Sequence, residues 1–430
     1  MNMKRKKYQS ILFLSLLCAW LAPVSAQHTY TLDECVREAL SNNVRMKNAV
    51  NNIGMAEQGK KEAFTKYFPS LSATGGGFIA NKGLVQMEMA PGQNMSMLKD
   101  GIVGGVSAAL PLFTGGQIIN GNKLARVDVE VNRLQQKLSE NEVRLTTEQY
   151  FWQVVMLKEK LNTISKVEQQ LAQILNDVEN SVSAGLTTRN DLLQVQLRCN
   201  ETKSGRIQIE NNLSLLRSML AQYIGHPADS VDVEFTTSDT LPDGPDMLYR
   251  EPQKSLILTD EYRLLEQQVK ANNLQYKMSI GKNLPTIALG GGYMYDNLMG
   301  KNQSFWMGFA TVSVPLSGWW GGSHDIKRQK LQVRNAENQK IDQSQMLVIR
   351  MQHTWNDLND AYKQIQIARL SIEQANENLR LNTDYYTAGT CTMSDLLEAQ
   401  TLYQQSCDKY VEVYTQYEIK KREYLQATGR

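Results

Sequence analysis

Apolar positions recur every seven residues along two long stretches of the chain that contain no proline. In the first stretch the series is Leu124, Val131, Leu138, Leu145 and Trp152, and it resumes after a phase slip at Leu157, Ile164, Leu171 and Val178. In the second it is Met351, Leu358, Ile365, Ile372, Leu379 and Tyr386. Sustained heptads predict coiled-coil helices over about 115–183 and 320–387, each roughly 100 Å long. A fibrous coiled-coil rod would show the same pattern.

Each predicted long helix ends at a glycine turn, after which a shorter helix returns. The turns are Ser183-Ala184-Gly185-Leu186 and Thr387-Ala388-Gly389-Thr390, and the return helices are predicted over about 190–224 and 394–427. A return is about half as long as the outgoing helix. Helical segments near 43–66 and 260–282 are therefore expected to cover the remainder, so that one long helix is paired with two short ones.

The chain contains this unit twice. A shift of 204 positions places Pro111 on Pro315, Gly185 on Gly389 and Gly225 on Gly429 without a gap. Register held over more than a hundred residues indicates a duplication. The repeats are expected over 27–225 and 260–430, with a linker over 226–259 that is rich in Pro and Asp.

Short segments rich in Gly, Ala, Val and aromatic residues precede each long helix, and their residues alternate with a period of two. They predict strands over about 70–80, 102–112, 286–295 and 304–316. Strands of about ten residues with one apolar face are typical of membrane β-barrels, although the edge of a soluble sandwich would look similar. The residues expected to face lipid are Leu71, Ile79, Ile287, Leu289, Tyr293 and Val312.

Four strands are too few to close a barrel. Because an open sheet edge is not tolerated in lipid, four strands per chain can span a membrane only by assembling with further copies. Closed cyclic symmetry then gives one barrel that continues into a ring of long helices. The strand count alone does not choose between three copies and four.

The N-terminus has the features of a secretory signal over 1–26. Basic residues at 4–7 precede an apolar stretch and the small-residue site Val24-Ser25-Ala26. After it, no apolar run reaches the 18 or so residues of a membrane helix. The formal net charge of +2 argues against a nucleic-acid partner. No catalytic, cofactor-binding or metal-binding motif is present, because the four histidines and the mature cysteines (Cys35, Cys199, Cys391 and Cys407) are scattered.

Several local motifs resemble the TolC-type outer membrane efflux family over essentially the whole mature chain. They are the opening Tyr30–Cys35, the strand starts at Tyr67–Leu71 and Leu284-Pro285, the strand ends at Leu110–Phe113 and Val314–Leu316, and the tips at Ala184–Leu186 with Asp191–Leu193 and Ala388–Thr390 with Asp395–Ala399. The resemblance implies a homotrimer with a twelve-strand outer-membrane barrel in contact with lipid and a periplasmic helical barrel. It implies an exit channel without enzymatic activity, fed by an inner-membrane pump through a periplasmic adaptor.

Two other functions remain open at this stage. One is the outer-membrane channel of a type I protein secretion system, which the same fold serves. The other is a non-conducting periplasmic coiled-coil scaffold, which would leave the four glycine-rich strands unexplained. The identity of the pump and of the exported substrate cannot be read from this chain.

The tip turns carry the predicted functional residues. The resemblance implies adaptor docking at Ala184, Gly185, Leu186, Ala388, Gly389 and Thr390. It also implies a periplasmic gate, with Asp395 and Glu398 at the narrowest point and Tyr386 latched to Asp191. Asp191 and Asp395 have the spacing of helix capping boxes as well, which explains them without a gate. Cys391 stands where the best-known relatives carry a basic residue, so the closed state is expected to leak.

Overall fold

The computed structural model describes residues 28–90, 93–227, 231–235, 241–298 and 301–430, so the predicted signal peptide lies outside the described residues. The chain divides into two compact units. We call the described parts of Met1–Asn48, Leu138–Leu258 and Leu347–Arg430 the tip unit, and those of Ala49–Lys137 and Thr259–Met346 the sheet unit.

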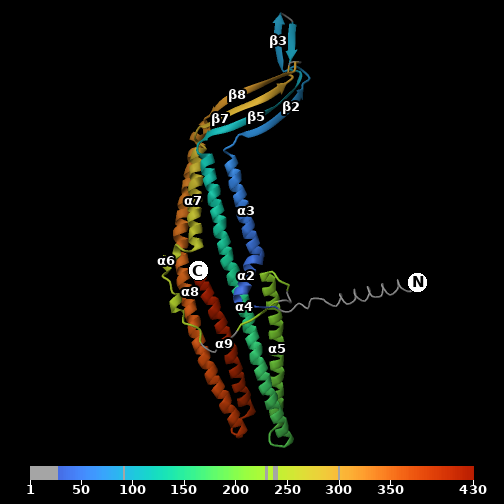
Figure 1. The fold of residues 1–430 in the computed structure, drawn as a ribbon, viewed down its shortest axis with the longest axis vertical. Helices are drawn as coiled ribbons and strands as arrows, with labels where there is room; N and C mark the ends of the chain where they lie inside the picture. Colours follow the sequence, from blue (N-terminus) through green and yellow to red (C-terminus); the bar gives the residue numbers. More distant parts are fainter. Residues whose placement is uncertain (1–27, 91–92, 228–230, 236–240, 299–300) are drawn as a thin grey trace, which may run out of the picture. The chain divides into compact units, whose positions relative to one another are not determined.

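Two helices of equal length dominate the chain (Figure 1). Helix α4 runs over Gln117–Ser183 and α8 over Gly321–Thr387, with 67 residues each. The returns are α5, Arg189–Ile224, and α9, Met393–Ala427. Helix α4 begins two residues later than the heptads suggested, because Gly115 and Gly116 have φ of +62° and +77°, outside the helical region.

Shorter helices supply the remaining helical segments. They are α2, Leu32–Asn42, α3, Val44–Thr65, α6, Pro252–Leu256, and α7, Asp260–Gly281. A capping box between Thr31 and Glu34 begins α2, and the Thr259 hydroxyl caps α7. Among the described residues, no helix combines the length and the apolar character needed to cross a bilayer.

The core of the tip unit follows the heptads. In α8, Met351, Leu358 and Ile365 are fully buried. Leu358 and Ile365 form one cluster with Tyr417 and Tyr424 of α9. In α4 the series after the phase slip is likewise buried (Leu157, Ile164, Leu171 and Val178). A pair of strands that the sequence did not predict, β1, His28–Tyr30, and β6, Val231–Val233, joins the chain start to the linker in parallel.

The sheet unit contains one four-stranded antiparallel sheet in the order β2-β5-β7-β8. Its strands are β2, Ser70–Ile79, β5, Asp100–Thr114, β7, Thr286–Asp296, and β8, Gln303–Ser313. Strand β8 stops before the predicted residue 316, because Pro315 has no N–H to donate and Leu316–Trp319 form a 3₁₀ turn, η2. A further hairpin, β3, Val85–Ala90, with β4, Gln93–Met97, fills the longer connection of the first repeat and was not predicted.

Candidate functional site

Both tip turns are built in the same way at one end of the tip unit (Figure 1). After α4, Leu186 N–H donates to Ser181 O at 2.8 Å and Gly185 N–H to Val182 O at 3.0 Å. After α8, the matching bonds join Thr390 to Tyr385 and Gly389 to Tyr386, each at 2.9 Å. This is the Schellman arrangement, which satisfies the last carbonyl groups of a helix. The duplication therefore preserves the turn down to individual hydrogen bonds.

The two turn glycines have the left-handed conformation that the motif requires. Gly185 has φ of +73° and Gly389 has φ of +72°. A Cβ added at either glycine would meet nothing within 4 Å. A larger residue would therefore strain only the backbone and fill open space. Beside Gly185, the Leu186 side chain is 81% exposed, so the first tip presents an apolar group that the chain itself does not cover.

A reciprocal capping box begins each return helix, as the spacing predicted. In α5, Thr188 Oγ1 accepts from Asp191 N–H at 3.3 Å, and Asp191 Oδ2 accepts from Thr188 N–H at 3.3 Å. In α9, the corresponding distances for Thr392 and Asp395 are 3.2 Å and 2.9 Å. Hydrogen bonds from Thr187 and Thr188 lower the pKa of Asp191, and those from Thr392 lower the pKa of Asp395. Both carboxylates are therefore charged at neutral pH.

The two helix starts differ in their second acidic position. Asp395 and Glu398 lie one turn apart on the exposed side of α9, while Leu396 and Ala399 are buried. In the first copy, Gln194 stands at the position of Glu398. Capping accounts for Asp395, but it gives no reason for Glu398. The second tip thus exposes a pair of carboxylates that the first tip lacks.

A cavity of about 620 Å³ separates the two tips, and Asp191, Tyr386, Cys391 and Met393 are among the residues that line it. Burial raises the pKa of the Tyr386 phenol, and the charge of Asp191 adds to this effect. The Asp191 carboxylate, however, accepts from the Thr187 hydroxyl at 2.5 Å and from Thr188, and not directly from Tyr386. Thr187, which was not among the predicted gate residues, therefore stands between the two predicted latch groups.

The duplication register could have identified Thr187. A shift of 204 positions places Thr187 on Cys391, so the residue before each cap differs between the copies. Thr187 binds the capping carboxylate of its own tip, whereas Cys391 Sγ donates to Asn382 O at 3.4 Å. Burial raises the pKa of the Cys391 thiol, which is therefore neutral and supplies no cation to the cavity.

An apolar cluster that shares Tyr386 and Met393 with the cavity lining joins the two tips. Val178 of α4, Val195 of α5 and Met393 and Leu396 of α9 are almost completely buried, and Tyr386 of α8 packs against them. Separating the tips would expose these side chains, at a cost of about 25 cal/mol per Å² of apolar surface. The tips therefore resist separation by apolar packing in addition to polar contacts.

The strand register places all six predicted lipid-facing residues on one face of the sheet. Residues that pair directly share a face, and the pairings connect Leu71 through Ala108 to Gly291, Leu289 to Ala310, and Ile287 to Val312. The same face carries further exposed apolar residues, which are Ile102, Val106 and Trp306. The opposite face has Ser and Thr at many positions, and Phe309 of β8 covers Gly290 of β7.

The described residues contain no group of His, Cys, Asp and Glu side chains that could hold a metal ion. Their four cysteines are free thiols, and burial raises the pKa of Cys35 to about 12. The described features of the site are the two tip turns, the capping carboxylates and the apolar sheet face.

The chain belongs to the outer membrane efflux protein family, whose pattern it matches over residues 35–226 and 256–430. The solved structures that it resembles include outer membrane channels. No curated protein sequence matches the chain significantly.

Solved structures share the fold at low sequence identity. The outer membrane protein VceC of Vibrio cholerae is 13% identical, with a TM-score of 0.78 and coverage of 93% of this chain and 96% of VceC. The CmeC outer membrane channel of Campylobacter jejuni is 14% identical, with a TM-score of 0.75 and coverage of 93% of this chain and 85% of CmeC. The open state of the MtrE channel of Neisseria gonorrhoeae is 15% identical, with a TM-score of 0.73 and coverage of 93% of this chain and 88% of MtrE.

Proposed function

We propose that this chain forms the outer-membrane exit channel of a tripartite efflux system, through which substrates pass passively from an inner-membrane pump and a periplasmic adaptor to the exterior. Three copies would close a barrel of twelve strands, and their helices would form one tunnel in the periplasm. The number three follows from the family resemblance, because the sheet itself requires only that several copies join.

The four-stranded sheet is the observation that carries this proposal. Strands β2 and β8 each pair on one side only within the described chain. Unpaired N–H and C=O groups cost several kcal/mol each in hydrocarbon, so a lipid-exposed sheet must close. Pairing β8 of one copy with β2 of the next satisfies both edges. The apolar face, with Leu71 77% exposed and Ile79 91% exposed, would then lie against lipid.

The tips would form the periplasmic end of the tunnel. In a trimer, Asp395 and Glu398 would place six carboxylates around one axis, which favours cations at the constriction. Tyr386, Thr187 and Asp191 would hold the two tips of each copy together in the closed state. The exposed turns at Ala184–Leu186 and Ala388–Thr390 would remain available to the adaptor.

Planar-bilayer recordings of the purified protein test this function directly. A trimeric channel should give discrete conductance steps, and it should be more permeable to cations than to anions. A protein that forms trimers but gives no conductance in either orientation would instead support a coiled-coil scaffold. Deletion of the gene is expected to sensitise cells to small toxic compounds, and failure to secrete a single protein instead would favour the type I secretion channel.

A further inference from the structure

The connection between β2 and β5 contains four methionines close together. They are Met87, Met89, Met95 and Met97, in a chain that has 18 methionines among 430 residues. Two of them lie in β3 and two in β4, at alternate positions of each strand. Strands favour β-branched and aromatic residues, so strand propensity does not account for this choice. The pattern points to the thioether group, which distinguishes methionine from the other apolar side chains.

The register of the hairpin brings these positions to one face. Met87 pairs directly with Met95, and Met97 pairs with Val85. Residues that pair directly share a face, as do residues two apart along a strand. Met87, Met95 and Met97 therefore lie on the same face of the hairpin, which we call the methionine face. Met89 lies beside them at a shift in the register.

The three positions of the methionine face form a small triangle. Directly paired residues, such as Met87 and Met95, have Cβ atoms about 4.5–5.5 Å apart, and diagonal neighbours about 7–8 Å apart. Met95 and Met97, two residues apart on one strand, are separated by about 7 Å. Methionine is unbranched and has three rotatable bonds, so it adapts to gaps of this size. Three sulfur atoms from these positions can therefore reach one small ion.

The donor chemistry of the methionine face selects the class of ion. Thioether sulfur is a neutral, soft ligand that suits Cu(I), whereas Mg²⁺ and Ca²⁺ take oxygen ligands. Residues 84–98 contain no Cys, His or Asp, and their one acidic residue, Glu88, pairs with Asn94 on the opposite face. The methionine face therefore lacks the thiolate, imidazole and carboxylate ligands that Zn²⁺ takes.

The hairpin lies at the end of the sheet opposite to the helices. Ile79 at the end of β2 pairs with Asp100 at the start of β5, whereas α3 precedes β2 and α4 follows β5. Strands β3 and β4 form a two-stranded sheet of their own, and neither pairs with the other described strands (Figure 1). The four-stranded sheet therefore leaves both faces of the hairpin unpaired with any further strand.

The second repeat builds its two strands without such a hairpin. Pro69 and Pro111 are 42 positions apart, whereas their counterparts Pro285 and Pro315 are 30 positions apart. Both repeats nevertheless contribute two paired strands to the same sheet. The sheet does not require the additional residues of the first repeat, so the hairpin is available for a separate role.

We propose that the methionine face binds one soft monovalent metal ion per chain, Cu(I) in the cell, through the thioether sulfur atoms of Met87, Met95 and Met97, with Met89 as a neighbouring fourth ligand. The site does not depend on the proposed channel function, because all its ligands come from one hairpin of one chain. Where the sheet spans the outer membrane as proposed above, the ion would be held at the external mouth of the channel.

Calorimetric titration of the detergent-purified full-length protein with Ag(I) tests this proposal. Ag(I) shares the ligand preference of Cu(I) and keeps its oxidation state in air. The four free cysteines also offer soft ligands, so accessible thiols are alkylated first. Met87→Leu with Met95→Leu keeps the volume and the apolar character of the face but removes two sulfur atoms. Since even groups that only orient metal ligands contribute about 10–100-fold to affinity, this variant should bind Ag(I) at least about a hundredfold more weakly.

The matched control removes two exposed sulfur atoms elsewhere. Met55→Leu with Met346→Leu changes side chains that are 65% and 58% exposed on α3 and α8, and it should bind Ag(I) as the wild type does. Spectra of the wild type with ¹³C-labelled methionine methyl groups locate the ion independently of the cysteines. Ag(I) should shift the signals of Met87, Met95 and Met97 and leave those of Met55 and Met346 in place.

Four results would overturn the metal site. Equal weakening in the control variant would show a diffuse affinity for exposed thioethers. Unchanged affinity in Met87→Leu with Met95→Leu would show that Ag(I) binds elsewhere. Equal affinity of the wild type for Zn²⁺ would remove the preference for soft ions. A wild-type trimer that conducts ions but shows no shift of the hairpin methionines with Ag(I) would remove this site and leave the proposed channel intact.

Discussion

The proposed lipid face can be tested by placing one charge on it. Leu289 lies in β7 on the apolar face, two residues from Gly291 at the centre of the 11-residue strand, and is 46% exposed. At about 3.3 Å per residue and a tilt of about 40°, these two residues correspond to about 5 Å of depth from the bilayer midplane. An arginine near the midplane costs about 2–4 kcal/mol. Leu289→Arg should therefore cost about 2–3 kcal/mol per copy, or roughly 6–9 kcal/mol in a trimer.

The control for this substitution comes from the register. Ala310 pairs with Leu289, and the next residue, Thr311, pairs with Ala288 on the opposite face. Thr311 is also exposed, so Thr311→Arg adds the same charge at similar depth toward the expected water-filled lumen. It should leave assembly close to that of the wild type.

Two measurements compare the variants. Semi-native gels give the yield of trimer in outer-membrane fractions, and urea titration in liposomes gives the concentration at which the protein unfolds. Leu289→Arg should lose most of the trimer and unfold at a lower urea concentration. If Leu289→Arg assembles normally while Thr311→Arg does not, the two faces have been assigned the wrong way round. If both assemble normally, the sheet does not lie in lipid.

Three further predictions concern the tips. Gly185→Leu should abolish export while trimers persist, because a Cβ at position 185 meets no atom of the chain. Loss of the trimer in gel filtration would show that the turn has only a structural role. Asp395→Asn with Glu398→Gln keeps an acceptor for the cap but removes both charges, so cation selectivity and block by hexammine cations should disappear at unchanged trimer yield. The control Asp191→Asn should retain both properties. Unchanged selectivity in the double variant would mean that these carboxylates serve only as helix caps. Because the pKa of Asp395 lies below its ordinary value of 3.8, the share of selectivity and cap stability that it provides should persist at pH 5 and be lost only as pH falls through that lower pKa. Tyr386→Phe should raise the resting conductance in bilayers, and an unchanged conductance would mean that the apolar cluster alone holds the tips closed.

The sequence by itself determined the elements that local periodicity and local chemistry control. The heptads predicted the long helices because each turn of a helix returns the same face to its partner, and Met351, Leu358 and Ile365 are fully buried. The spacing of Thr392 and Asp395 predicted a capping box, since both partners lie within one turn. The glycine turns were also readable, because a left-handed residue at a helix end favours glycine.

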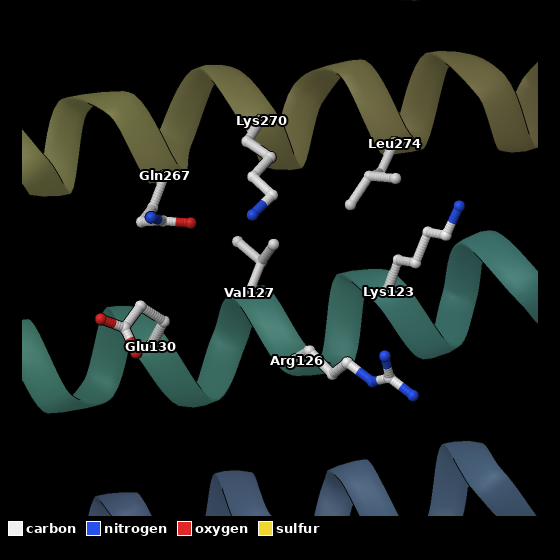
Figure 2. A pocket seen from close by; sticks show the side chains of 7 residues that line it. All are labelled: Lys123, Arg126, Val127, Glu130, Gln267, Lys270 and Leu274. Atoms are coloured by element: carbon white, nitrogen blue, oxygen red, sulfur yellow. The ribbon is translucent and has the colours of Figure 1, made fainter.

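Only the tertiary structure decided which distant residues meet. The parallel pair β1 and β6 joins three-residue segments about 200 positions apart, too short to carry a periodic signal. Tyr386 and Asp191 were expected to bind directly, and the packing of one hairpin against the other does bring both to the same cavity. The Asp191 carboxylate, however, accepts from the Thr187 hydroxyl, four residues away in its own tip. The contact of α4 with α7 was equally invisible, because Val127 and Leu274 become buried neighbours only when two helices from different repeats lie side by side (Figure 2). Local interactions fix each helix and turn, whereas packing between repeats fixes the sites.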